Sequence, residues 1–263
     1  MNMEDKLLDF TQVCEAPGAL ATDETLSMML TRYHFAAAHA RGRETLELAC
    51  GAGCGLGYIA RMARRVTGGD VDPKNLAPAL ERYRDNKRVD VRQVDALDCP
   101  FDDDSFGAVV LLDSIYWLSS APRFFAEASR LLQPKGVLVI STVNPDWHGF
   151  NPSPRAVRYY NIPELAYGLR EAGFNPSFHT GFRDRPEGIR GRCVAGVRWV
   201  AVKTGLIPTS VVAKEKLKRI FYGSLKKFPD EITDDIAPLE NLQSVADDYR
   251  GTGEKIIYTA AVL

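Results

Sequence analysis

The feature that most constrains the fold is a short apolar run followed by four glycines at alternate positions, 51, 53, 55 and 57. Thr45 to Ala49 is typical of a buried strand, and it contains the acid Glu47. Glycine permits tight turns and lets a ligand approach the backbone where a Cβ atom would block it. Apolar residues then recur at helical spacing, which predicts a helix over 56–66. The glycines therefore occupy a strand-to-helix turn, where doubly wound sheets bind their ligands.

The neighbours of the glycines distinguish among the folds that use such a turn. No lysine of the P-loop type follows them. A dinucleotide-type G-x-G-x-x-G/A pattern fits only from Gly55 to Ala60, and that frame starts too far beyond the strand. The remaining pattern is an acid, Glu47, followed by Gly51, Gly53 and Gly55.

This pattern resembles motif I of the class I S-adenosylmethionine (SAM)-dependent methyltransferases, with Ala49 in place of the first glycine. The resemblance continues in order from about Thr45 to Thr142, through a second strand ending near Asp70, the stretch around Asp95, a fourth strand over 106–113 and a helix, turn and strand over 126–140. As a set, these motifs are specific to that family.

The resemblance implies SAM as the cofactor and assigns roles to individual residues. Asp70 would accept hydrogen bonds from both ribose hydroxyls, Asp95 would meet the adenine amino group, and the backbone N–H of Ala96 would meet a ring nitrogen. The full set of cofactor residues that we expect is Glu47, Ala49, Gly51, Gly53, Asp70, Val71, Asp95, Ala96 and Asp113.

Strand and helix patterns alternate through the first two thirds of the chain, which favours parallel strands with helices on both faces. The predicted helices cover 23–40, 56–66, 73–86, 122–132 and 162–172, and the predicted strands cover 45–49, 66–70, 89–94, 106–113, 137–142, 174–178 and 255–262. The resemblance implies a doubly wound, seven-stranded Rossmann-like methyltransferase sheet of order 3-2-1-4-5-7-6, with the last strand antiparallel.

The pattern divides the chain into three parts. Residues 1–44 are predicted to form an N-terminal helical cap, residues 45–182 with 253–263 the SAM-binding core, and residues 183–252 a helical insertion before the last strand. Within the insertion, 211–228 carries lysines opposite an apolar stripe, as a basic amphipathic helix does. Such a helix can contact an anionic membrane surface or steer an acidic substrate, or it can pack on the core with its lysines in solvent.

Composition excludes several other classes. With 33 Lys plus Arg against 34 Asp plus Glu, the net charge is −1, which does not favour nucleic acid as a partner. The five cysteines are odd in number and lack C-x-x-C spacing, so we expect neither a disulfide framework nor a metal site. The chain has no secretory signal and no apolar run of ~18 residues, so we expect a cytoplasmic protein.

The Pro-rich, aromatic stretch 144–160 follows a predicted strand end, and we expect it to cover the substrate that accepts the methyl group. Within it, His148 is the predicted catalytic residue, because imidazole can remove a hydroxyl proton near neutral pH. The leading hypothesis is methyl transfer from SAM to a small molecule, such as a sugar or another polar metabolite, with O-methylation slightly preferred. The alternatives are a SAM-binding regulatory protein without turnover and, less favoured, a nicotinamide-dependent dehydrogenase.

Overall fold

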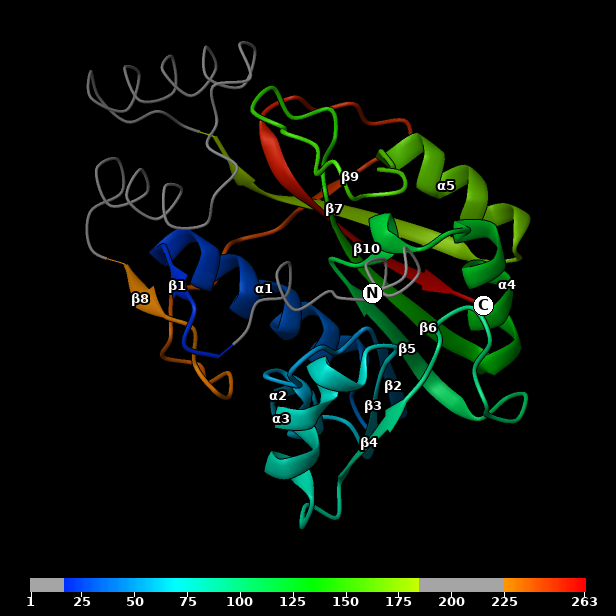
Figure 1. Ribbon diagram of the computed structural model, residues 1–263. Helices are drawn as coiled ribbons and strands as arrows, with labels where there is room; N and C mark the ends of the chain where they lie inside the picture. Colours follow the sequence, from blue (N-terminus) through cyan, green and yellow to red (C-terminus); the bar gives the residue numbers. More distant parts are fainter. Residues whose placement is uncertain (1–16, 185–224) are drawn as a thin grey trace.

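The structure is a computed structural model that describes residues 17–184 and 225–263. A central sheet has the strand order β4-β3-β2-β5-β6-β10-β7-β9 (Figure 1). Its strands are β2 (Glu44–Leu48), β3 (Arg65–Asp70), β4 (Val89–Gln93), β5 (Phe106–Leu112), β6 (Leu132–Val143), β7 (Asn175–Arg183), β9 (Gln243–Val245) and β10 (Glu254–Val262). A separate two-stranded sheet pairs β1 (Leu20–Ala21) with β8 (Lys226–Lys227).

Strand direction follows the predicted pattern. Strands β4, β3, β2, β5 and β6 are parallel to their neighbours, whereas β10 is antiparallel to both β6 and β7, with Tyr258 opposite Ser141 and His179. In chain order these seven strands reproduce the order 3-2-1-4-5-7-6, so the predicted fold class is confirmed. The structure adds one strand to it, because β9 pairs with the outer edge of β7.

Helices cover both faces of the sheet (Figure 1). Helices α1 (Asp23–His39), α2 (Leu56–Ala60) and α3 (Pro73–Tyr83) share one apolar core with one face of the strands, and α4 (Ala121–Leu131) and α5 (Ile162–Glu171) share a second core with the other. Adjacent strand residues alternate between these cores, as Val109 and Val110 do. In the part of the chain that the structure describes, no helix has the length and apolar character needed to cross a membrane.

Side chains cap four of these helices. Thr22, Asp72 and Ser120 each accept a hydrogen bond from a backbone N–H in the first turn of α1, α3 and α4. Asn161 and Glu164 form a reciprocal capping box at α5. The start of α2 has no such side-chain cap, because its N-cap is Gly55 in the glycine turn.

One element differs clearly from its prediction. The helix expected over 56–66 ends at Ala60, and strand β3 already begins at Arg65. Val66 pairs with Thr45 and Val89 in the sheet, so its β-branched side chain belongs to a buried strand and not to the apolar face of a helix. Strand β6 is also longer than predicted, because it continues directly from the end of α4 at Leu132.

The predicted insertion is only partly described. Residues 185–224 lie outside the described residues, and so does most of the predicted basic helix over 211–228. Its last residues, 225–228, are extended: Lys226 and Lys227 form β8, and Phe228 is buried. From 225 to 252 the described chain contains the short strands β8 and β9 and otherwise irregular backbone.

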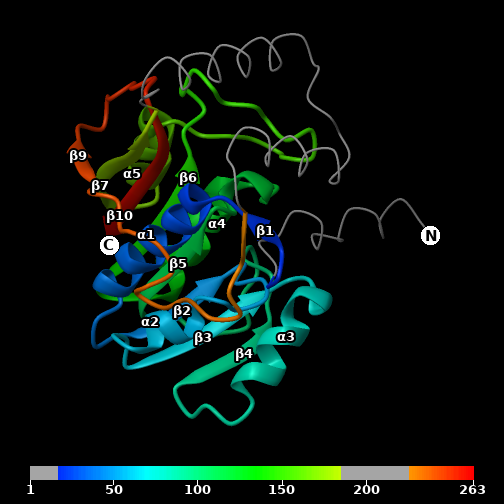
Figure 2. The same ribbon diagram turned by 90° about the vertical axis from the view of Figure 1, so that its left-hand side faces the viewer.

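This irregular part packs closely on the core. Figure 2 shows the segment after β8 (orange) passing α1 and α2. Ile232 is 2% exposed and joins the core of α1 and α2, and its backbone N–H donates to the Cys54 carbonyl at 2.9 Å. The Glu240 N–H donates to Thr31 Oγ1 in α1 at 3.0 Å. The segment is therefore part of the folded domain and supports the glycine turn from outside.

We expect Ile232→Ala to lower the free energy of unfolding by about 2–5 kcal/mol, because it removes a fully buried side chain and leaves a cavity. Urea unfolding followed by circular dichroism measures this loss. Leu239→Ala is the matched control, since Leu239 is 48% exposed and should cost well under half as much. Equal small losses in both variants would mean that the segment does not pack as described.

Candidate functional site

A cavity of about 400 Å³ opens at the carboxyl ends of the central parallel strands. It is lined by α1, the glycine turn after β2, the end of β3, residues 94–97 after β4, and residues 112–119 after β5. This is the edge where open α/β sheets bind ligands, and the volume falls in the range of small-molecule sites.

The structure brings most of the predicted cofactor residues to this cavity. Seven of the nine line it: Ala49, Gly51, Asp70, Val71, Asp95, Ala96 and Asp113. The other two, Glu47 and Gly53, lie behind the lining. The resemblance to motif I implied that both lie beside the ligand, but the direction of each residue depends on the folded backbone.

Asp70 is the centre of the cofactor side of the cavity. Its carboxylate accepts hydrogen bonds from the backbone N–H groups of Gly51 and Asp72, both at 2.9 Å. Burial raises the pKa of Asp70, and these backbone hydrogen bonds act in the opposite direction. Because a carboxylate has about four acceptor positions, Asp70 can also accept hydroxyl groups from a ligand in the cavity. The two hydroxyl groups of a ribose could donate to these free positions of the carboxylate.

The lining after β4 provides the next part of the site. Val94, Asp95, Ala96 and Leu97 all contact the cavity, and Asp95 Oδ1 accepts the Leu97 N–H at 2.9 Å. The apolar side chains can cover a flat ring, while the Asp95 carboxylate can accept from an exocyclic amino group. The lining therefore fits an adenine beside a ribose.

The turn itself requires unusual backbone angles. Ala49, Gly51 and Gly53 have φ of 56°, 56° and 69°. Ala49 occupies this left-handed region at a cost of roughly 1–2 kcal/mol, which the first glycine of the family pattern avoids. At Gly53 an added Cβ would lie 2.7 Å from Ala79 Cβ in α3. Gly53 thus permits close packing of α3, and it is absent from the described lining of the cavity.

The ring of Tyr33 in α1 packs against the glycine turn at Gly55, whereas α3 packs against it at Gly53. An added Cβ at Gly55 would lie 1.9 Å from the Tyr33 ring, so this position needs glycine for close packing. The Tyr33 hydroxyl donates to Glu47 Oε1 at 2.8 Å. Burial raises the pKa of Glu47 to about 7, although the Tyr33 hydroxyl and Arg32 lower it. The second oxygen, Oε2, is buried without a hydrogen-bond partner among the described residues.

Arg32 and Asp113 form an ion pair at the end of the cavity beyond the glycine turn. The Arg32 guanidinium donates to Asp113 Oδ2, and Ser141 Oγ donates to Asp113 Oδ1 at 2.9 Å. Burial works against the charge of Arg32, but Asp113 and three nearby tyrosines raise its pKa. The arginine side chain is 10% exposed and that of Asp113 is 25% exposed. The ion pair and the hydrogen bond from Ser141 therefore hold both side chains in the cavity wall.

Helix α1 contributes residues that were not among the predicted site residues, although the edge of the predicted helix over 23–40 was expected to reach the substrate site. The helix itself is confirmed, with Met29 and Tyr33 on its buried side. Met29, Arg32 and Tyr33 all line the cavity. Arg32 was the signal in the sequence, because it is a charged residue next to the buried face of the helix. A buried arginine needs a charged partner, which often lies at a functional site.

Aromatic rings form the wall at the same end. Tyr116 and Trp117 of the 3₁₀ turn η1 (Ile115–Trp117) line the cavity. Tyr159 stacks on Tyr116 with ring centroids 5.0 Å apart, and the Val157 N–H donates to the Tyr116 carbonyl at 2.8 Å. The loop predicted to cover the acceptor thus supports the wall from behind, and its own residues are absent from the described lining.

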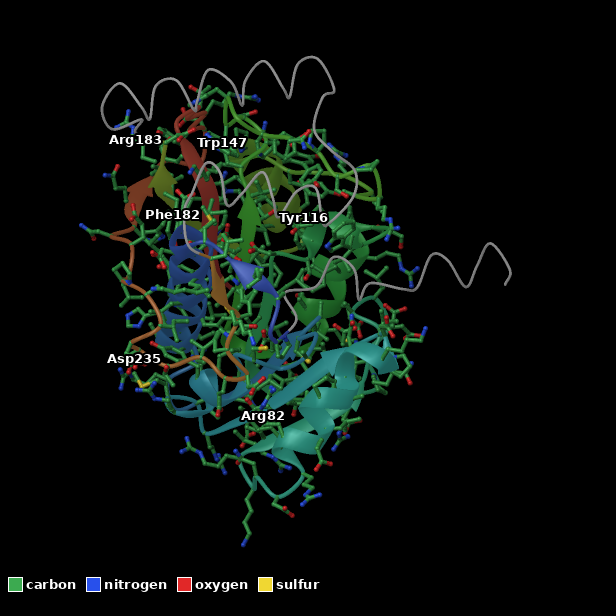
Figure 3. All side chains as sticks on the ribbon, turned by 60° about the vertical axis from the view of Figure 1, so that its left-hand side comes forward. Arg82, Tyr116, Trp147, Phe182, Arg183 and Asp235 are labelled. Atoms are coloured by element: carbon green, nitrogen blue, oxygen red, sulfur yellow. The ribbon has the colours of Figure 1, made fainter. Side chains whose placement is uncertain are left out.

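The structure does not bring His148 to the cavity. Its Nδ1 donates to the Thr252 carbonyl at 2.7 Å, its Nε2 lies 3.5 Å from Asp184 Oδ2, and its side chain is 52% exposed. Figure 3 shows the adjacent Trp147 near Arg183 and apart from Tyr116. The loop turns toward β7 and β10 after it leaves β6, a direction that sequence cannot show. His148 therefore has no geometric support as the catalytic base.

The sheet order and the glycine turn are those of the class I SAM-dependent methyltransferase fold, and the cavity fits an adenosine group. Residues 46–140 match the family model described as a methyltransferase domain. This stretch is thus the core that the chain shares with that family, and SAM is its cofactor.

Curated relatives agree with this assignment over part of their length. The chain is 37% identical over 139 residues to a Mycolicibacterium smegmatis protein named "Probable S-adenosylmethionine-dependent methyltransferase/", covering 51% of this chain and 52% of that protein. It is 30% identical over 154 residues to a fatty-acid O-methyltransferase of the same organism, covering 57% and 52%. The chain thus spans about half the length of these relatives.

Solved structures share the fold over most of the chain. A SAM-dependent methyltransferase from Thermotoga maritima has a TM-score of 0.58 at 13% identity and covers 90% of this chain and 89% of its own. The [4+2]-cyclase SpnF also has a TM-score of 0.58, at 20% identity, with 98% and 92% covered. At these identities the similarity concerns the fold alone.

We expect Asp70→Ala to weaken SAM binding by about two to four orders of magnitude, because two charge-assisted hydrogen bonds of roughly 1.5–3 kcal/mol each are lost. Isothermal titration calorimetry measures the change. Asp90→Ala is the control, since Asp90 lies in the neighbouring strand β4 and pairs with Arg92 outside the cavity. Unchanged affinity in a folded Asp70→Ala protein would remove Asp70 from the site.

We expect Glu47→Gln to remove a pH dependence of stability. With its pKa raised from 4.5 to about 7, Glu47 contributes stability that is complete below about pH 4.5 and is lost as the pH rises to about 7. The glutamine amide cannot ionise, so the variant should match the wild type near pH 5 and exceed it at pH 8. Urea unfolding at both pH values tests this, and a difference independent of pH would contradict it.

Proposed function

We propose that this protein transfers the methyl group of SAM to a small-molecule acceptor, with a hydroxyl oxygen as the preferred acceptor atom. One observation carries the proposal: the cavity that fits adenosine is continuous with the wall of Tyr116 and Trp117. A second molecule bound at that wall would lie at the far end of the cofactor, where its reactive group is.

SAM supplies a methyl group that its sulfonium already activates, so the protein's task is mainly to position the acceptor and exclude water. The rings of Tyr116 and Trp117 offer apolar faces to the acceptor, and Tyr159 supports them from behind. Methyl transfer from such a sulfonium to a well-positioned acceptor does not require a strong general base. The proposal therefore does not depend on His148.

The aromatic wall of Tyr116 and Trp117 and the names of the relatives both support a class of acceptor. Aromatic faces pack against flat or aliphatic bodies and also against sugar rings. Relatives with 30% identity include the fatty-acid O-methyltransferase and a demethylmenaquinone methyltransferase of Tropheryma whipplei. We propose a hydroxylated acceptor with an apolar part, and a sugar remains the polar alternative.

A second candidate is a SAM-binding protein that does not transfer methyl groups. It is favoured by the similarity to SpnF, because a protein named a cyclase shares the fold as closely as a methyltransferase does. Fold similarity of this kind does not determine the reaction.

Methyl-labelled SAM distinguishes the two candidates. Excess protein and labelled SAM are mixed with one acceptor pool at a time: hydroxylated fatty acids, phenols or quinols, or sugars. The label transferred to the acceptor is then measured within a single turnover. Transfer to any pool supports the proposal. SAM binding without transfer to any of them favours the second candidate, and a melting temperature raised by NAD and not by SAM would indicate the dehydrogenase.

With an active acceptor, we expect Trp117→Ala to raise the acceptor KM by about 10–100-fold, since burying an aromatic ring contributes roughly 1.5–3 kcal/mol. SAM affinity should change by less than about threefold on the same argument, because the cofactor residues stay intact. Tyr167→Ala is the control, as this aromatic residue of α5 is 69% exposed and outside the cavity. An unchanged acceptor KM in Trp117→Ala would place the acceptor elsewhere.

A further inference from the structure

The stretch of chain that follows β4 is held in place by helix α4. Residues 94–97 of this stretch line the cavity, and the chain then runs through Cys99 and Phe101 to β5. Two charged side chains near the end of α4, Glu127 and Arg130, bind this stretch, and we call them the α4 brace. Both are absent from the described lining of the cavity, so any effect that they have on a ligand passes through the residues between.

The Arg130 guanidinium uses all five of its N–H donors. One N–H of Nη2 and the N–H of Nε donate to the two carboxylate oxygens of Glu127, at 2.6 and 3.0 Å. The other three reach the Cys99 carbonyl at 3.1 Å, the Phe101 carbonyl at 2.8 Å and Asp103 Oδ1 at 2.7 Å. A planar fork that is bound at every donor has one orientation, and it holds the stretch at three points.

Glu127 completes the α4 brace. Its Oε1 also accepts the backbone N–H of Cys99 at 2.8 Å. Hydrogen bonds from Arg130 lower the pKa of Glu127, which favours the carboxylate that accepts these donors. The N–H and the carbonyl of Cys99 are thus both bound to α4, one to a carboxylate and the other to a guanidinium.

Cys99 connects the α4 brace to Asp95. Its Sγ donates to the Asp95 carbonyl at 3.3 Å, and the Asp98 N–H donates to the same carbonyl at 3.1 Å. Burial raises the pKa of Cys99 to about 12, so the sulfur keeps the proton that it donates. Within the same turn, Asp95 Oδ1 accepts the Leu97 N–H at 2.9 Å. The turn over 95–99 therefore sets the direction of the Asp95 carboxylate, and this turn is anchored on α4.

We propose that Glu127 and Arg130 are positioning residues for the adenine of SAM, because they hold Asp95 where its carboxylate accepts the adenine amino group. The proposal rests on the SAM site described above and adds two residues that do not touch the ligand. Asp95 is exposed, so its own packing does not fix its direction. Without the α4 brace the turn over 95–99 loses its anchor, and the preference for an amino group on the purine ring is lost with it.

Two ligands that differ only in that amino group provide the test: S-adenosylhomocysteine and its analogue with hydrogen in place of the 6-amino group. Neither carries a methyl group to transfer, so their calorimetric affinities are independent of turnover. We expect the wild-type protein to bind the amino ligand about tenfold more tightly, as one hydrogen bond to an exposed carboxylate gives. Asp95→Ala should abolish this preference. Equal affinities in the wild type would overturn the proposal, whereas a wild type that binds neither ligand would refute the SAM site itself.

Arg130→Met removes the charge and keeps most of the aliphatic stem. The preference for the amino ligand should fall from about tenfold to under about twofold, because Asp95 is no longer held toward the amino group. Arg130→Lys should restore part of the preference, because an ammonium has three donors for the five acceptors around Arg130. A full preference in a folded Arg130→Met protein would show that Arg130 only supports the fold, and would overturn the proposal.

Arg43→Met is the matched control. Arg43 also donates to two backbone carbonyls, those of Gly107 at 2.6 Å and Lys135 at 3.2 Å, but it precedes β2 and lies at the end of the strands opposite the cavity. This variant should change both affinities by the same factor. If Arg130→Met does not fold, Glu127→Gln takes its place, because the amide keeps only one of the two acceptor oxygens. The preference should then fall by at least about threefold, and an unchanged preference would overturn the proposal.

Discussion

The hydrogen bond from the Gly51 N–H to the Asp70 carboxylate connects the two strand ends on which the cavity is built. Asp70 also accepts the N–H of Asp72, the residue that caps α3. One buried carboxylate thereby fixes the glycine turn, the end of β3 and the start of the next helix relative to one another. The cofactor side of the site depends on this arrangement, because the glycine turn and the end of β3 both line the cavity.

The wall opposite the cofactor residues is built by α1, and α1 is in turn supported by a segment that is remote from it in the sequence. Helix α1 contributes Tyr33 against the glycine turn and Arg32 against Asp113. The segment around Ile232 in turn packs on α1 and α2 and donates a backbone hydrogen bond to Cys54. Residues before the matched core therefore line the cavity directly, and residues after it support α1 and the glycine turn from outside. Substitutions in either segment can alter ligand binding without touching a cofactor motif.

The features that sequence predicted well are those encoded locally. Alternating strand and helix patterns determine a doubly wound sheet, and a strand end followed by glycines has few uses other than ligand binding. Asp70 and Asp95 reach the cavity because the carboxyl ends of parallel strands meet at one edge. The helix expected over 56–66 was wrong at its end for a non-local reason, since Val66 is held by strands on both sides.

The sequence by itself determined the class of fold and the residues at the strand ends, because these follow from spacing along the chain, and its resemblance to a known family indicated the cofactor. Only the tertiary structure decided which side chains complete the site. It directed Gly53 toward α3, took His148 toward Thr252, and placed Arg32 of α1 beside Asp113. Such contacts depend on how separate elements pack and on the direction a loop takes, and neither is a property of any local stretch of sequence.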